Sequence, residues 1–198
     1  MNAFPQPMNE DQFWEIVERS IPDESDSLQN HENRYRQSIS SLSAEEMIRF
    51  QLKFDELKWK ADTPRLSQAV YIVTNGCGDD DFQSFVAGLI AQGRKVFYHF
   101  LEDPESMLLS LPNPERFERY EIFDCIPIQI YEERVGQHIY ANKPIPDDGE
   151  NRDLERRLFL EEYTEDPQDL KLQFPKLFAK FWRAPGPTSV AETNEGLL

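Results

Sequence analysis

The sequence is poor in the residues that build cross-linked or metal-bound cores. It has two cysteines, Cys77 and Cys125, and three histidines in 198 residues. Two cysteines are too few for a disulfide framework or a zinc cage. His31, His99 and His138 stand alone, without the pairing that transition-metal sites usually show, although one of them could serve as a general base. We therefore expect no disulfide, no bound metal and no cofactor.

Long apolar runs are also missing. The longest uncharged windows, Leu66–Gly78 and Phe82–Gly93, span 13 and 12 residues. A helix needs about 20 apolar residues to cross a bilayer. The first seven residues, MNAFPQP, lack the basic and apolar regions of a secretory signal. These features predict a cytoplasmic protein that does not enter a membrane, and reduced cysteines suit that compartment.

Basic residues are scarce relative to acidic ones. Lys and Arg number 21 against 37 Asp and Glu, which gives a net charge of −16 and an isoelectric point of about 4.6. The charge is −5 over residues 1–60, −5 over 61–122 and −6 over 123–198. We therefore expect no nucleic-acid partner and no anionic membrane surface. A basic protein partner or a cationic ligand is compatible with this charge.

Large apolar side chains are plentiful, with 14 Phe, 7 Tyr and 3 Trp. A chain of this length buries roughly 70% of its unfolded surface, which is enough for one core. We predict a flexible lead over residues 1–8, one helical domain over 9–183 and a disordered tail over 184–198, which is rich in Pro, Gly, Ser, Thr and Glu. The sequence does not indicate an oligomeric state.

The clearest helix is predicted between Asn75 and Arg94. Asn75 and the glycines at 76 and 78 are expected to supply positive-φ and turn conformations, and the Asp run favours a helix that begins near Asp79 or Asp80. The apolar residues that follow share one helical face, and Gly93 is expected just after the last turn. These apolar residues are Phe82, Phe85, Val86, Leu89 and Ile90.

Capping signals predict the two helices before it. Ser43 and Glu46 form a capping box that opens a helix to about Lys60. The predicted core face of this helix consists of Met47, Phe50, Phe54 and Leu57. Thr63 then caps a helix with Pro64 at its first position. The β-branched residues at 70–74 are also compatible with a strand, but the Thr-Pro start favours a helix.

Shorter helices are predicted elsewhere, and the fold class is therefore all-α, a single compact domain of about eight to ten short helices. The alternation of isoleucines at 126, 128 and 130 resembles a strand, but Pro127 at a first helical position and a closing Gly136 favour a helix. The aromatic stripe Phe174–Trp182 is interpreted as core rather than as a docking surface. The other predicted helices lie at 9–21, 23–41, 94–102, 103–108 and 154–159, and after Pro167 and Pro175.

A family resemblance rests on the run GCGDDDFQSFVAGLIAQGRKVF and the LEDPESM segment that follows it. The segments FWEIVERS, SLSAEEMIRFQLKFDEL, IYEERVG and FPKLFAKFW fit the same pattern. On these residues the chain resembles the bacterial family called domain of unknown function 4240, roughly from Met8 to Trp182. Gly78, Val86 and Gly88 stand where the family pattern has Ser, Arg and Trp. The resemblance implies no activity, substrate or catalytic residue.

Three features of the Gly76–Asp81 turn and its helix are candidates for function. Asp79, Asp80 and Asp81 suit a helix N-terminus, but adjacent carboxylates can also bind Mg²⁺ or Ca²⁺. Cys77 precedes the same N-terminus, where a thiolate nucleophile would be favoured, although packing is the more common role. Arg94 is expected to meet the last carbonyls of the helix or to pair with one of the Asp side chains.

Two functions are compatible with these observations. The leading hypothesis is a non-enzymatic protein-interaction or regulatory module, because catalytic motifs are absent and dispersed acidity suits a basic protein partner. The alternative is a metal-dependent hydrolase or transferase with its site at the Gly76–Asp81 turn. In that enzyme Asp79 or Asp80 would be a metal ligand or an acid/base, and Arg94 would steady an anion.

Overall fold

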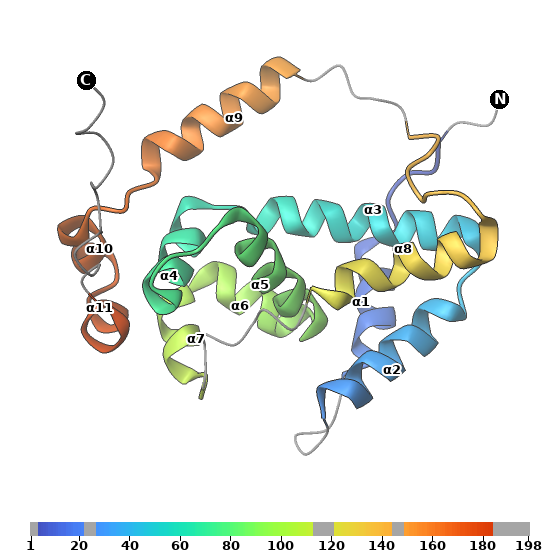
Figure 1. Ribbon diagram of the computed structural model, residues 1–198, viewed down its shortest axis with the longest axis horizontal. Coiled ribbons are helices and arrows are strands. Elements are labelled where there is room, and N and C mark those ends of the chain that lie inside the picture. Colours follow the sequence, from blue (N-terminus) through green and yellow to red (C-terminus); the bar gives the residue numbers. More distant parts are fainter. Residues whose placement is uncertain (1–3, 22–26, 113–120, 144–148, 184–198) are drawn as a thin grey trace, which may run out of the picture.

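The fold is organised around α3 (Ala44–Ala61), the longest helix of the computed structural model (Figure 1). The structure describes residues 4–21, 27–112, 121–143 and 149–183, and the predicted tail at 184–198 lies outside them. The capping box is present, since the Ser43 N–H donates to Glu46 at 2.8 Å and the Glu46 N–H donates to Ser43 Oγ at 3.3 Å. The predicted core face is buried, with Met47, Phe50 and Phe54 at 0% exposure.

The described residues form eleven helices and no strand, which confirms the all-α prediction. Segment 70–74 is helical and Thr63 caps it, as predicted. The remaining helices are α1 (Glu10–Glu18), α2 (Leu28–Ser40), α4 (Pro64–Thr74), α5 (Asp79–Ala91), α6 (Arg94–Glu102), α7 (Pro104–Ser110), α8 (Ile122–Val135), α9 (Gly149–Glu162), α10 (Pro167–Gln173) and α11 (Pro175–Phe181). No helix in this part of the chain is both long and apolar enough to span a bilayer.

The turn between α4 and α5 sets the direction of the central helix. Asn75 is left-handed at φ 57° and Gly76 has φ 120°, as expected for the end of α4. Gly78 differs from the prediction, because it is extended (φ −77°, ψ 166°) and is the N-cap of α5. Its N–H donates to Asp81 Oδ2 at 3.4 Å. The α5 helix begins at Asp79 and its predicted apolar face is buried.

One continuous core joins the helices. It runs from Met8 to Leu177 and contains side chains from α1 to α8 and from α10 and α11. Met8 is 6% exposed and its N–H donates to the Arg49 carbonyl at 2.8 Å. The predicted flexible lead is therefore anchored at residue 8, and residues 1–3 lie outside the described part. Because one core serves all these helices, the described chain is a single domain.

The α8 helix begins five residues earlier than predicted. The sequence placed Pro127 at a first helical position, but α8 starts at Ile122 and Pro127 lies inside it. Proline removes one helical hydrogen bond and disfavours a helix interior. Phe123 and Ile126 on the preceding turn are fully buried, and their packing stabilises that turn. The predicted closing residue is confirmed, since Gly136 is the left-handed C-cap.

Gly93 links α5 to α6 in a conformation that other residues rarely adopt. Its φ is 90° and its ψ is 171°, and a Cβ there would lie 2.6 Å from Ile21 Cδ1. We expect Gly93→Ala to lower the free energy of unfolding by about 1–3 kcal/mol, measured by urea denaturation. Gly136→Ala is the control, because Gly136 has φ 74° and nothing within 4 Å of its added Cβ. Equal losses in the two variants would contradict the role of the Ile21 clash.

The C-terminal helices pack on α4 and α7, while α9 extends away from the body (Figure 1). The end of α9 is held by Gln68, whose Nε2 donates to the Thr164 carbonyl at 3.2 Å. In the aromatic stripe, Phe174 is buried, as is Leu177, and Phe178 and Trp182 are half-buried and stack at 4.9 Å. The stripe is therefore core on one side and partly exposed on the other.

Candidate functional site: an acidic groove

A groove of about 610 Å³ opens between α3, α5 and α8. It lies where the start of α5 and the start of α8 approach the C-terminal half of α3. The residues that line it are Lys58, Asp80, Asp81, Gln83, Ser84, Ala87, Glu121 and Asp124.

A smaller hollow of about 260 Å³ adjoins it along α3. The two share Lys58 and Gln83, so they form one surface that we call the acidic groove. Its carboxylates are Asp55, Asp62, Asp80, Asp81, Glu121 and Asp124, and Lys58 is the one cation among the described lining residues. The lining of the smaller hollow is Asp55, Lys58, Trp59, Asp62 and Gln83.

The Lys58 charge is neutralised from within the groove. Its Nζ donates to Asp124 Oδ2 and forms an ion pair with it. Gln51, which is 1% exposed, donates to Asp124 Oδ1 at 2.9 Å and to Asp55 Oδ1 at 3.3 Å. The amide thus fixes a carboxylate of α8 against a carboxylate of α3. Among the described residues, Asp80, Asp81 and Glu121 form no ion pair with a cation.

Asp55 also interacts with the segment after α8, which contributes a hydrogen bond and a cation. The Tyr140 hydroxyl donates to Asp55 Oδ2 at 2.8 Å, and Lys143 Nζ lies 3.9 Å from the same oxygen. Burial raises the pKa of Asp55 above its ordinary value, while the hydrogen bonds from Tyr140 and Gln51 oppose that rise. Asp124 adds to the rise because two nearby carboxylates repel one another.

Asp62 is a second groove carboxylate whose pKa is raised. It is the C-cap residue of α3. Burial raises its pKa, the charge of Asp79 raises it further, and Arg156 of α9 opposes the rise. Neighbouring carboxylates thus oppose the ionisation of two groove residues, Asp55 and Asp62. A cation bound there would relieve this repulsion.

The three predicted aspartates occupy the first turn of α5 in different roles. Asp80 and Asp81 line the acidic groove, and Asp79 is close enough to Asp62 to raise its pKa. Asp81 also accepts the Gly78 N–H, which is the capping role expected of it. Two of the three thus belong to the groove, and one of those also caps the helix.

Cys77 lies in an environment that disfavours a thiolate. The thiol is half-buried, and burial raises its pKa to about 11, with a further contribution from the charge of Asp81. Burial and the adjacent carboxylates outweigh the helix N-terminus and favour the protonated thiol. This environment suits packing, the more common role for Cys77, better than the alternative of a thiolate nucleophile.

Arg94 lies away from the turn and pairs with α1. It begins α6, so the whole of α5, about 18 Å of helix, separates it from Asp79. Its Nη1 lies 2.7 Å from Asp11 Oδ1 and its Nη2 lies 3.7 Å from Glu10 Oε1. The sequence offered Arg94 the last carbonyls of α5 or an Asp side chain of the turn, but in the described part of the chain its partners come from α1.

The described residues contain no cluster of three His, Cys, Asp or Glu side chains that could hold a metal ion. The groove carboxylates of α3, α5 and α8 line a wide surface instead of converging on one point. The alternative site at the Gly76–Asp81 turn therefore lacks a ligand set, and Arg94 is too distant to steady an anion there.

Sequence reasoning missed the groove residues outside the Asp run. Asp55, Trp59 and Asp62 recur at intervals of four and three residues, which places them on one polar face of the predicted α3 helix. That spacing was the available signal. Nothing local connects α3 with Asp124, which is 73 residues from Gln51 in the chain.

The fold and the groove define a single-domain, all-helical protein with an acidic cleft between three helices. A family model described as "Protein of unknown function (DUF4240)" matches residues 8–133. The chain belongs to this family. The match includes α3, α5 and most of α8, and thus every groove residue, but stops short of the Trp182 boundary expected from the resemblance. No curated protein and no solved structure matches the chain.

Proposed function

We propose that this protein is a non-enzymatic binding module whose acidic groove takes a basic segment of a partner protein. The observation that carries the proposal is the charge of the groove, which has six carboxylates and one lysine that is already paired with Asp124. A basic segment would neutralise carboxylates that now repel one another, and its charge would speed the encounter.

Trp59 supports a peptide with Lys or Arg side chains in particular. It is 58% exposed and lines the groove beside Asp55 and Asp62. An exposed indole between carboxylates can bind a cation in two ways, through the face of its ring and through the negative charge around it. Arginine and lysine side chains use both interactions, whereas an uncharged apolar ligand cannot interact with the carboxylates.

The metal-dependent enzyme has no comparable support. Cys77 is protonated, Arg94 is committed to α1, and the carboxylates of the turn have no third ligand among the described side chains. We place the binding module in the bacterial cytoplasm as part of this proposal, on the strength of the family resemblance and of two unpaired cysteines.

Charge removal in the groove should weaken binding of a basic peptide. We expect Asp80→Asn/Glu121→Gln to reduce the affinity for an arginine-rich peptide about fivefold to tenfold, since two exposed ion pairs contribute on the order of 1 kcal/mol. Binding is measured by isothermal titration calorimetry at 0.05 M and 0.5 M salt. Both side chains are exposed, and neither forms a side-chain hydrogen bond with another described residue that the substitution would remove.

The matched control is Glu102→Gln/Glu133→Gln, which removes the same charge from exposed positions outside the groove. It should leave the affinity within twofold of the wild type. Equal weakening in both variants would show that net charge alone drives the binding, and absence of binding in the wild type would overturn the proposal. Native co-purification in low and high salt then identifies the cellular partner.

A further inference from the structure

The last two helices carry a concentration of positive charge in an acidic chain. Residues 167–183 contain four cations and one acid, Asp169, whereas the whole chain has a net charge of −16. All four cationic side chains are exposed. We call this set the basic face, and its residues are Lys171, Lys176, Lys180 and Arg183.

The cations of the basic face have no acidic partner in the described part of the chain. None of its four side chains forms an ion pair there, although Lys176 is close enough to Asp103 to help lower the pKa of that carboxyl. Arg49, Arg65 and Lys95 also lack an ion pair in that part, whereas six other cations are engaged by neighbouring acids. These pairs are Arg19–Glu15, Arg36–Glu32, Lys53–Glu56, Lys58–Asp124, Arg94–Asp11 and Lys143–Asp55.

The fold holds this face outward. Glu105 of α7 accepts the backbone N–H groups of Lys176 and Leu177 at 2.8 and 3.1 Å, which fixes the start of α11. Leu177 points into the core with 0% exposure. Lys176 and Lys180 are four residues apart on the exposed side of the same helix. The cations are therefore presented by an anchored helix rather than by a free chain end.

Exposed apolar surface accompanies the charge. Leu172 of α10 is 81% exposed, and Lys180 Nζ lies 4.8 Å above the ring of Phe181. The basic face therefore offers a partner an apolar contact beside its cations.

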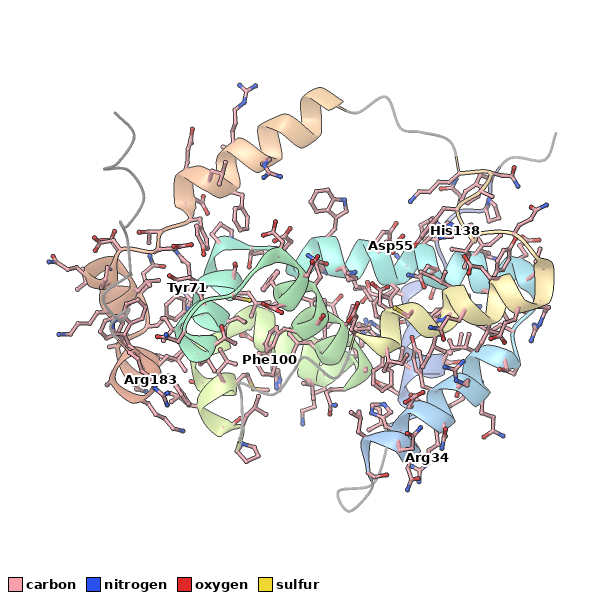
Figure 2. All side chains as sticks on the ribbon, viewed as in Figure 1. Arg34, Asp55, Tyr71, Phe100, His138 and Arg183 are labelled. Atoms are coloured by element: carbon pink, nitrogen blue, oxygen red, sulfur yellow. The ribbon has the colours of Figure 1, made fainter. Side chains whose placement is uncertain are left out.

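The basic face and the acidic groove lie at separate places on the molecule. Figure 2 labels Arg183 beside α11 and Asp55 far from it on α3. One copy therefore cannot cover its own groove with its own basic face. Two copies can meet through these surfaces.

We propose that the basic face of one copy docks in the acidic groove of a second copy. The inference rests on the proposed function of the groove and names a second copy of this chain as its partner. The contact is heterologous, because each copy offers a different surface. A bound pair keeps one free groove and one free basic face, so further copies can add head to tail.

Salt should affect this assembly in two opposite ways. Two copies of net charge −16 repel one another at long range. At 0.15 M salt the Debye length is about 8 Å, so remote repulsion is screened while contact pairs persist. At 1 M it is about 3 Å and the contact pairs weaken too. Association should therefore be strongest at intermediate salt.

Two complementary variants test the interface. Lys176→Glu/Lys180→Glu reverses two of the four charges of the basic face and keeps the groove, while Asp80→Lys/Glu121→Lys reverses two groove charges and keeps the basic face. Sedimentation velocity of the full chain at 0.15 M salt should show wild-type oligomers that grow with concentration. Each variant alone should be monomeric, and their mixture should form a 1:1 dimer and nothing larger.

The control is Arg19→Glu/Lys95→Glu, which changes the net charge by the same amount as Lys176→Glu/Lys180→Glu at exposed positions outside both surfaces. It should associate like the wild type, and circular dichroism should show the same helix content in all variants. A monomeric wild type at every concentration and salt, or variants that do not pair when mixed, would overturn the proposal.

The experiments distinguish failure of head-to-tail association from failure of the groove to bind a basic segment. If the wild type is monomeric but binds the arginine-rich peptide, the groove binds a basic partner that is not a second copy. If it neither associates nor binds the peptide, both proposals fail.

Discussion

Phe13→Ala should lower the free energy of unfolding by about 3–5 kcal/mol. The Phe13 ring of α1 is fully buried and lies among three other aromatic rings. Ring centroids are 4.6 Å apart for the stacked pair with Phe50, 5.1 Å for Trp14 and 6.2 Å for Phe54. Alanine would leave a cavity that rigid aromatic neighbours cannot fill, and α1 would lose its main attachment to α3.

Urea denaturation followed by circular dichroism measures this loss. Phe13→Leu keeps most of the volume and should cost about 1–2 kcal/mol. Trp59→Ala removes a larger aromatic side chain that is 58% exposed, and it should change stability by no more than about 0.5 kcal/mol. A loss for Phe13→Ala no greater than that for Trp59→Ala would contradict the role assigned to the aromatic cluster.

The packing of α1 also explains why Arg94 pairs with residues of that helix. Packing of Phe13 and Trp14 brings Glu10 and Asp11 of the same helix to the start of α6. The sequence could not predict this pair, because Asp11 and Arg94 are 83 residues apart. From the sequence alone, we could consider only partners that lie close to Arg94 in the chain, within residues 75–94.

Local chemistry predicted most helix ends correctly. The capping box at Ser43, the Thr63 cap before Pro64 and the left-handed Gly136 each rest on backbone groups within a few residues. Such signals work because a helix end must satisfy its own free N–H and carbonyl groups. The start of α8 was wrong for the complementary reason, since buried packing of Phe123 outweighs the local preference of Pro127.

The candidate site was predictable only where it coincides with a helix end. Asp80 and Asp81 were found because an acidic run before an apolar stripe is conspicuous in the sequence. Asp124 became a groove residue through tertiary packing of α8 against α3, to which Gln51 adds a buried hydrogen bond. The basic face was missed because the charge was summed over residues 123–198, which hides a local excess of cations. The four cations are nevertheless visible in the sequence.

The family boundary separates the two surfaces of opposite charge. The acidic groove lies within the matched residues 8–133, whereas the basic face lies in α10 and α11 beyond them. A family member that lacks such a basic C-terminal segment should keep the groove function and not assemble head to tail. The two proposals can therefore be separated by deleting charge from α11 without altering the matched domain.

His31 should make the fold acid-sensitive by about 2–3 kcal/mol between pH 7.5 and 4.5. The ring is 1% exposed and packs 4.6 Å from the Phe123 ring. Burial lowers its pKa from 6.5 to about 4, the charge of Arg34 lowers it further, and a hydrogen bond to the Ala91 carbonyl opposes the change. Nε2 has no hydrogen-bond partner among the described residues, so a proton gained there would be buried without an acceptor.

The direction of the stability change with pH follows from proton uptake by His31. Below pH 6.5 the unfolded chain binds a proton at His31 while the folded protein does not, so stability falls as the pH drops toward 4. Each pKa unit corresponds to about 1.4 kcal/mol. His31→Gln cannot titrate but keeps an N–H donor for Ala91, so its loss on acidification should be smaller than that of the wild type by about 2–3 kcal/mol.

Urea denaturation at pH 7.5 and 4.5 measures the difference, and carboxylate titration cancels because both proteins share the same acids. His138→Gln is the matched control, since His138 is exposed and lies beside Glu132 at 3.6 Å. It should retain the acid sensitivity of the wild type. If His31→Gln loses as much stability on acidification as the wild type does, His31 is not the buried titrating group that this geometry requires.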